Sequence, residues 1–125
     1  MFKYVLLSCF FFFGHACAQD VCQFIVGASV ISYDGSFLGK LTNAYAPDSI
    51  FNGYGVYGNQ NSAVSIWNRY GIYGGQNSRQ SPFNPYTSIP PILVKEGQVI
   101  ARFTINKHLG GVPSISPYTI KSCGF

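Results

Sequence analysis

The ionisable side chains that could support catalysis are few and widely separated in this chain. Acid–base or nucleophilic catalysis requires such groups to be brought together, yet 125 residues contain only two histidines and four acids, which are Asp20, Asp34, Asp48 and Glu96. Ser32, His108 and Asp48 would make a hydrolytic triad on paper, but nothing in their spacing recommends it. No zinc, phosphate-loop or dinucleotide motif occurs, and no loop alternates acidic ligands as calcium sites do. We therefore expect no catalytic residue, no metal and no cofactor.

A repeated segment carries the aromatic and amide side chains that could bind a ligand. Residues 49–58 (SIFNGYGVYG) return 16 positions later as residues 65–74 (SIWNRYGIYG), and a third copy begins at residues 81–86 (SPFNPY). Rings stack on sugars and amides bond their hydroxyls, in pockets that are mostly apolar with a few placed polar groups. The candidate ligand-binding residues are Trp67, Tyr70, Tyr73, Tyr54, Tyr57 and Asn68.

Two other roles are open to the same residues. Hydrophobic cores use the same residue types, and we expect at least half of the repeat aromatics to be buried and to build the domain. Repeats rich in glycine, tyrosine and amides can also stack between chains, although the many glycines and the prolines near Ser81 argue against a long cross-β segment. The burial of Trp67, the single tryptophan, distinguishes a structural role from a binding role.

The spacing of the aromatic residues restricts the backbone that can carry them. Rings three residues apart would alternate between the two faces of an extended strand, and the repeat glycines would each cost a helix about 1 kcal/mol. We therefore expect a turn-rich coil in which Asn52, Asn68 and Asn84 cap or bridge turns. A solenoid generally needs three or more units. This chain has two copies and part of a third, so we predict two equivalent arms that lie on a framework of β-hairpins.

The first residues have the features of a secretory signal peptide. Lys3 precedes a short apolar run at residues 5–13, and Ala16-Cys17-Ala18 gives the small-x-small pattern that precedes cleavage. We expect residues 1–18 to be removed and residues 19–125 to form a single domain, exported to the periplasm or the extracellular space. Lipidation at Cys17 is the alternative. No later stretch is long and apolar enough to span a bilayer.

Two cysteines, Cys22 and Cys123, stand near the ends of the chain that remains. In an oxidising compartment they are expected to pair, because a metal site would need further ligands and His108 is the only histidine left. A bridge closing about 100 residues would stabilise the fold by up to ~4–5 kcal/mol in the chain-entropy model.

Two segments that flank the repeats have the signals of β-hairpins. Asp34-Gly35 and Glu96-Gly97 each lie between apolar and β-branched residues, in residues 28–42 and 92–106. A last short strand is expected at residues 118–121, and no segment shows an uninterrupted helical stripe. The predicted fold is mainly β: two β-hairpins packed together, long turn-rich aromatic and glycine repeat loops at residues 49–86, and termini tied by a disulfide.

The charges of the mature chain are sparse and scattered. Loss of Lys3 leaves seven of the eight basic residues against four acidic ones. Nucleic-acid-binding surfaces are usually clustered, so we expect no nucleic-acid partner. A cell-envelope glycan or protein is the expected class of partner, and the sequence leaves the oligomeric state open.

The chain resembles a set of small, uncharacterised exported bacterial proteins. The shared features are the DGxFLGKL hairpin that begins at Asp34, the 16-residue SI(F/W)NxYGxYG repeats, Pro90-Pro91 and the second hairpin ending near Asn106. The resemblance implies a bacterial, exported, single-domain protein and brings no activity or ligand with it. We expect a non-enzymatic structural or interaction module of the cell envelope. A glycan- or cell-wall-binding module is the alternative, and a hydrolase-type enzyme is the outside alternative.

Overall fold

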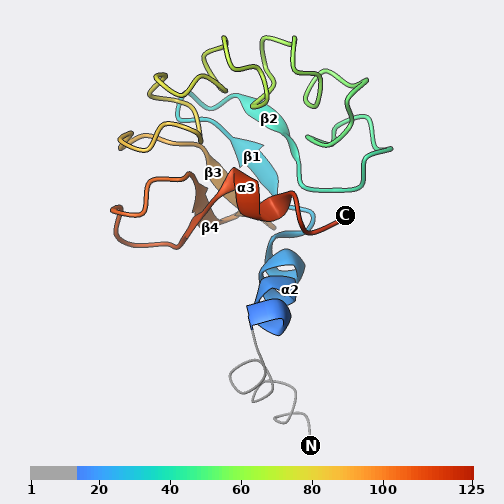
Figure 1. Cartoon of the computed structure of the whole chain (residues 1–125), viewed down its shortest axis with the longest axis vertical. Coiled ribbons are helices and arrows are strands. Elements are labelled where there is room, and N and C mark those ends of the chain that lie inside the picture. The colour runs from blue at the N-terminus through green and yellow to red at the C-terminus, as the bar shows by residue number, and fades with distance from the viewer. Residues whose placement is uncertain (1–13) are drawn as a thin grey trace, which may run out of the picture.

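Within residues 14–125, the regular structure consists of five short strands and two helices (Figure 1). The computed structural model describes residues 14–125, so Lys3 and the apolar run of the expected signal peptide lie outside the described residues. In chain order the elements are α2 (Gly14–Ile25), β1 (Ser29–Ile31), β2 (Phe37–Lys40), β3 (Ile92–Lys95), β4 (Gln98–Phe103), β5 (Ser114–Ile115) and α3 (Pro117–Ile120).

The strands form one sheet in the order β2-β1-β3-β4-β5. β1 and β2 make the first hairpin and β3 and β4 the second, and antiparallel pairing of β1 with β3 joins them, with Val30 opposite Leu93. β5 is added parallel to β4. The predicted pair of hairpins packed together is confirmed, and the two share a single sheet.

The two hairpins turn by different backbone conformations. Glu96 and Gly97 both have positive φ, 53° and 78°, as a two-residue type I′ turn requires. In the first hairpin Gly35 has a φ of 89°, whereas Asp34 is not among the described residues with positive φ. The carboxylate of Asp34 accepts the backbone N–H of Ser36 at 3.0 Å, so its side chain stabilises this turn.

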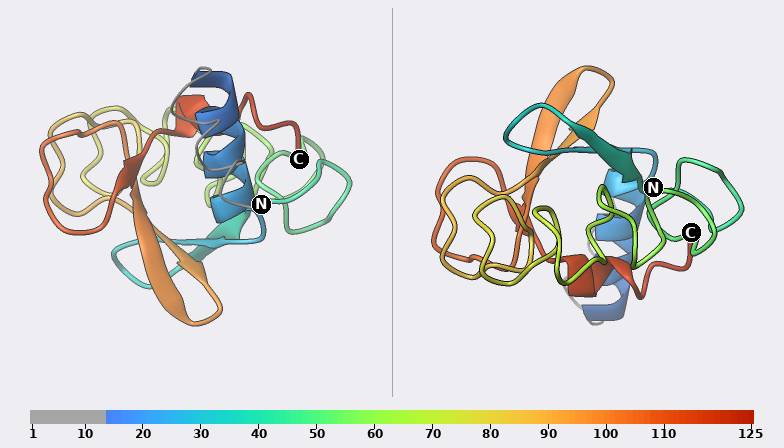
Figure 2. Two further views of the ribbon diagram at one scale, coloured as in Figure 1. Left: turned by 90° about the horizontal axis from the view of Figure 1, so that it is seen from below. Right: turned by 90° about the horizontal axis from the view of Figure 1, so that it is seen from above.

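The repeat segment leaves the sheet after β2 and returns to it at β3 (Figure 1, green to orange). Both views in Figure 2 show this coil and the sheet on opposite sides of the molecule, with α3 beside the coil. The buried core lies between them and draws apolar side chains from every layer: Ile25 of α2, Leu38 of β2, Ile66 of the coil, Phe103 of β4 and Ile120 of α3.

The expectation of a last strand at residues 118–121 was wrong. Residues 118–121 belong to or follow helix α3 and form no strand, because Pro117 starts the helix and Ser116 Oγ accepts the N–H of Tyr118 at 3.0 Å. The strand that completes the sheet is β5, just upstream. A helix also spans Gly14–Ile25 and includes the expected cleavage point after Ala18.

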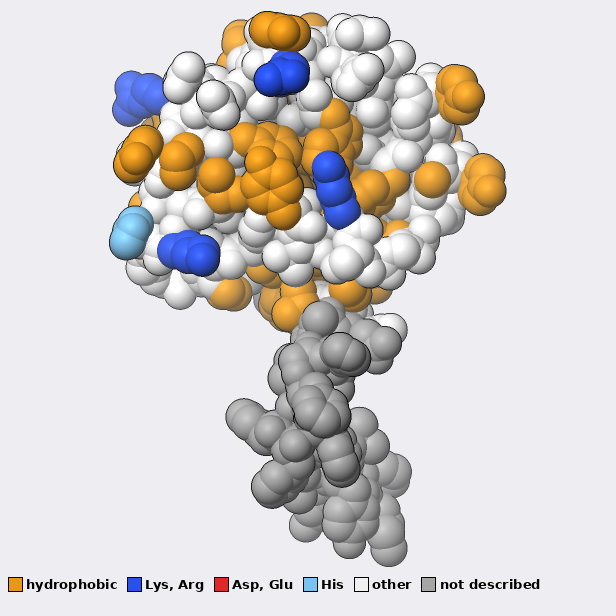
Figure 3. Space-filling model, in the orientation of Figure 1, with side chains coloured by type: hydrophobic (Ala, Val, Ile, Leu, Met, Phe, Trp, Pro, Cys, Tyr) orange, Lys and Arg blue, Asp and Glu red, His pale blue; other side chains and the backbone are white. Residues whose placement is uncertain are grey.

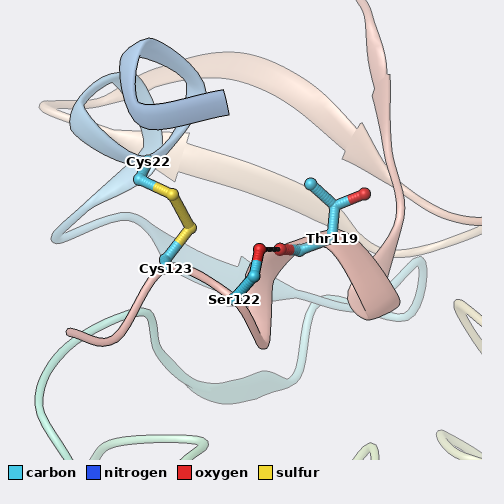
Figure 4. Close-up of a disulfide and its surroundings, with 4 residues drawn as sticks. All are labelled: Cys22, Thr119, Ser122 and Cys123. Atoms are coloured by element: carbon cyan, nitrogen blue, oxygen red, sulfur yellow. Dashed lines mark hydrogen bonds between the residues drawn. A yellow bond between two sulfur atoms is a disulfide. The ribbon is translucent and has the colours of Figure 1, made fainter. Parts of the chain in front are cut away.

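The predicted disulfide is present between Cys22 and Cys123, with sulfurs 2.04 Å apart. It joins α2 to the segment after α3, where Ser122 Oγ donates to the carbonyl of Thr119 at 2.8 Å (Figure 4). The bond closes a separation of 101 residues, so both ends of the described domain are fixed to one another.

Candidate functional site

The repeat coil is a continuous series of short turns. Backbone N–H groups donate to the carbonyl three residues earlier, and the donors recur at the same positions in each copy. Such bonds satisfy the backbone without a sheet, and the predicted turn-rich coil is therefore confirmed. The corresponding donors are Ser49, Asn52 and Gly55 in the first copy, Ser65, Asn68 and Gly71 in the second, and Ser81, Asn84 and Thr87 in the third.

The three repeat asparagines stabilise these turns through both ends of the amide. Asn52, Asn68 and Asn84 each accept the backbone N–H two residues ahead, at 3.0, 3.0 and 2.9 Å. Each also donates from Nδ2 to the carbonyl six residues behind, at 3.1, 3.0 and 3.1 Å. Asparagine recurs because its side chain supplies both an acceptor and a donor at this position.

The third copy is more complete than its sequence suggests. The turn bonds continue through Ser78, Ser81, Asn84 and Thr87, although prolines and a threonine replace the arginine and glycines of the second copy. Each end of the coil is bonded to the strand region: Ile50 N–H donates to Lys40 at 3.0 Å, and Pro82 accepts from Ile105 at 2.9 Å. The third copy therefore continues the series of turns beyond the two arms that the sequence predicts, and the coil is bonded to the strand region near both of its ends.

One side chain from each copy contributes to a row of aromatic rings. The ring centroids of Phe51 and Trp67 are 6.4 Å apart, and those of Trp67 and Phe83 are 5.8 Å apart. The C-terminal segment extends the row at both ends, with Phe125 5.8 Å from Phe51 and Tyr118 5.3 Å from Phe83. Aromatic pairs at these separations attract one another, so the row joins α3 and the C-terminus to the coil.

Trp67 is half-buried at the centre of this row. Its indole N–H donates to the carbonyl of Ile50 at 2.5 Å, which connects the second copy to the first. The ammonium of Lys121 lies 5.0 Å from the centroid of its ring, within the range of a cation–π contact. Trp67 therefore supports the fold by one edge while another part of the indole faces solvent.

A cavity of about 650 Å³ opens beside Trp67 between successive copies. Its volume is in the range typical of ligand sites. Four aromatic rings line it, together with Arg69 and two amides, so apolar faces and hydrogen-bonding groups converge on one space. The rings belong to Trp67, Tyr70, Phe83 and Tyr118, and the amides to Gln76 and Asn77.

Only two of the six predicted binding residues line this cavity, Trp67 and Tyr70. Tyr54 occupies the same repeat position as Tyr70 and is fully exposed, at 102 % against 90 %, but it is not part of the cavity wall. Asn68 uses its amide within the coil, as described above.

The other two predicted residues attach the coil to the first hairpin. The ring of Tyr57 packs edge-on against Phe37, with centroids 5.0 Å apart. The hydroxyl of Tyr73 donates to the carboxylate of Asp34 at 2.7 Å and lies 3.2 Å from Ser36 Oγ. Tyr57 and Tyr73 therefore join the coil to the sheet.

Hydrogen bonds at this junction alter the acidity of Asp34. Donation from Ser32, then from Tyr73 and Ser36, holds the pKa of the Asp34 carboxyl well below its usual range, because each donor stabilises the charged form. The carboxylate is a structural acceptor at the tip of the first hairpin.

Among the hydrogen bonds of the described residues, none joins the side chains of Ser32, His108 and Asp48. Ser32 donates its hydroxyl to Asp34, and His108 lies exposed in a loop where its backbone N–H donates to Asn106 at 3.0 Å. Within residues 14–125, no three His, Cys, Asp or Glu side chains gather as metal ligands would.

Sequence reasoning missed several parts of the cavity wall, Arg69 among them. Phe83 is the third-copy counterpart of Trp67, and this periodic match was the available signal. Tyr118 reaches the site through α3, from a segment predicted as a strand. Gln76 and Asn77 belong to the part of the repeat that has no aromatic residue.

Comparisons with protein-family models, curated proteins and solved structures found no match. Among the helices of the described chain, none has the length and apolar character needed to cross a membrane.

Proposed function

We propose that this protein is an exported, non-enzymatic interaction module of the bacterial cell envelope, and that it binds a glycan in the cavity beside Trp67. The observation that carries the proposal is the convergence of four aromatic rings and two amides on one cavity of about 650 Å³. Sugar rings present apolar faces for stacking and hydroxyls for hydrogen bonding, and this wall offers partners for both.

The exposure of the rings supports binding over a purely structural role. Tyr70 is 90 % exposed and Tyr118 is 60 % exposed, so much of their surface is not used in packing. The wall is also held in place: Trp67 is bonded to Ile50, and Asn68 fixes the turn that precedes Tyr70. A site formed in advance loses little side-chain entropy when a ligand binds.

The structural alternative rests on the inner residues of the coil. Ser49, Ile50, Ser65 and Ile66 are fully buried, and they form part of the domain whether or not a ligand exists. The two roles belong to different positions of the same repeat, since the outward rings are not needed for this packing.

The test compares Tyr70→Ala with Tyr54→Ala. The two tyrosines share a repeat position and an exposed environment, but only Tyr70 lines the cavity. We expect Tyr70→Ala to weaken retention on an insoluble cell-wall glycan by about tenfold, the equivalent of roughly 1.4 kcal/mol. Tyr54→Ala should leave retention unchanged, and both variants should melt at the wild-type temperature, which thermal denaturation would verify.

Equal retention of the two variants would contradict a site at this cavity. Failure of the wild-type protein to be retained by any glycan in a panel of cell-envelope polysaccharides would contradict glycan binding altogether.

A further inference from the structure

A second cavity, of about 570 Å³, shares Tyr118 with the first. Tyr118 lines both cavities, so the two cavities meet at this residue. The second cavity is bounded by Thr104 and Lys107 after β4, by Ser116 before α3 and by Val21 of α2. A ligand with several sugar units could therefore continue from one cavity into the next across Tyr118.

Basic side chains lie in or beside both cavities. Arg69 lines the first and Lys107 lines the second. Lys121, on the turn after α3, holds its ammonium over the ring of Trp67. Figure 3 shows lysine and arginine side chains around an apolar patch near α3, and no acidic side chain on that face of the described residues.

The acidic residues lie elsewhere. Among the described residues, neither cavity is lined by Asp20, Asp34, Asp48 or Glu96. The nearby cations thus have no carboxylate partner from the cavity walls, although the chain as a whole has only a modest excess of positive charge. Such an arrangement attracts a ligand that carries negative charge.

The position of Lys121 favours a negatively charged sugar over a neutral one. Its ammonium lies 5.0 Å from the Trp67 centroid and so competes with a neutral sugar for the face of that ring. A sugar that carries a carboxylate gains an ionic partner at the same place, and Arg69 can bind a carboxylate through two parallel hydrogen bonds.

We infer that the ligand is an acidic oligosaccharide, with a carboxylate on its sugar rings, that spans both cavities across Tyr118. This inference rests on the proposed glycan-binding function and specifies its substrate class. Arg69 pairs with a carboxylate in the first cavity and Lys107 with one in the second. Lys121 adds positive charge beside the first cavity, over the ring of Trp67. The aromatic rings stack on the sugars between these charges.

The test uses oligogalacturonates of increasing length, each compared with its fully methyl-esterified, neutral counterpart, in calorimetric titrations. We expect the acidic form to bind at least about tenfold more tightly than the neutral form, in line with charge-assisted hydrogen bonds. Affinity should rise with length until both cavities are filled, and it should fall as salt is raised.

Three variants test which basic side chain pairs with the ligand in each cavity. Arg69→Gln should weaken binding of short and long acidic oligomers alike, whereas Lys107→Gln should weaken only the long ones. Arg79→Gln is the matched control, because Arg79 is an exposed cation of the same coil that lines neither cavity. It should bind both oligomers as the wild type does.

The outcomes separate this inference from the proposed function. Equal affinity for acidic and esterified oligomers would overturn the acidic-ligand inference and leave glycan binding in place. Affinity that is independent of length, or unaffected by Lys107→Gln, would overturn the continuous two-cavity site. If a single-stranded oligonucleotide bound more tightly than every oligosaccharide, the proposal that the ligand is a sugar would be wrong. If neither the acidic nor the neutral series binds, both proposals fail.

Discussion

Tyr73 and Asp34 form a side-chain hydrogen bond between the coil and the first hairpin. The hydroxyl of Tyr73 donates to the carboxylate of Asp34 over a separation of 39 residues, and Ser32 and Ser36 donate to the same carboxylate. Aromatic residues of the repeat therefore differ in role by position: Tyr73 attaches the coil to the first hairpin, whereas Tyr70, three residues earlier, is left exposed at the cavity.

This contact predicts a dependence of stability on pH. The folded state lowers the pKa of Asp34 below its ordinary value of 3.8, so the unfolded chain binds a proton there more readily than the folded chain does. The stabilisation is complete above about pH 4 and is lost progressively as the pH falls below the unfolded pKa. We expect Asp34→Asn to destabilise the protein at pH 7 and to flatten the loss of stability between about pH 4 and pH 2.

Chemical denaturation at a series of pH values would measure this effect. Tyr73→Phe should produce part of the same change, because it removes one of the donors, while Tyr54→Phe should have no effect, since Tyr54 is fully exposed. Parallel pH profiles for the wild type and Asp34→Asn would show that the carboxylate does not contribute to folding.

At the scale of the elements, glycine allows the coil to bend back on itself. A Cβ atom added to Gly74 would lie 2.3 Å from the carbonyl oxygen of Asn68 and 2.5 Å from that of Ile66. At the equivalent Gly58, the added atom would lie 2.0 Å from the oxygen of Asn52. These contacts are with backbone atoms, so a side chain cannot be accommodated without displacing the turn.

Gly74→Ala is therefore expected to destabilise the fold by about 1–3 kcal/mol or more, as overpacking does. Gly53→Ala is the matched control, because an added Cβ there meets nothing within 4 Å, and its stability should stay within about 0.5 kcal/mol of the wild type. Thermal or urea denaturation measures both. If the two variants are equally stable, the turns of the coil are not packed as described.

The elements also show where sequence reasoning succeeds. The hairpins were predictable because Asp34-Gly35 and Glu96-Gly97 are local turn signals, and the turn-rich coil followed from aromatic spacing and glycine content. Helix α3 was missed because Ser116 and Pro117 start it over only four residues, too few for a periodic pattern. Of the four rings that line the cavity, Trp67 and Tyr70 lie within one repeat and could be named from the sequence, whereas Tyr118 reaches them only through tertiary packing.

At the scale of the whole molecule, the coil is attached to the rest of the protein at several points. Its ends are bonded to Lys40 and Ile105, and the row of aromatic rings joins its middle to α3. The disulfide then fixes the segment after α3 to α2. These connections hold both cavities between elements that are far apart in sequence, so the cavity walls depend on packing across the described residues.

The central claim is that the cavity beside Trp67 is a glycan site, and tryptophan fluorescence tests it most directly. Trp67 is the only tryptophan, and its half-buried indole lines the cavity, so its emission reports on this site alone. We predict partial quenching by acrylamide in the free protein. Saturating oligogalacturonate should protect the indole from acrylamide and shift its emission. The Tyr70→Ala variant should need a higher oligogalacturonate concentration for the same change. Emission and quenching that stay constant with every glycan would contradict the claim.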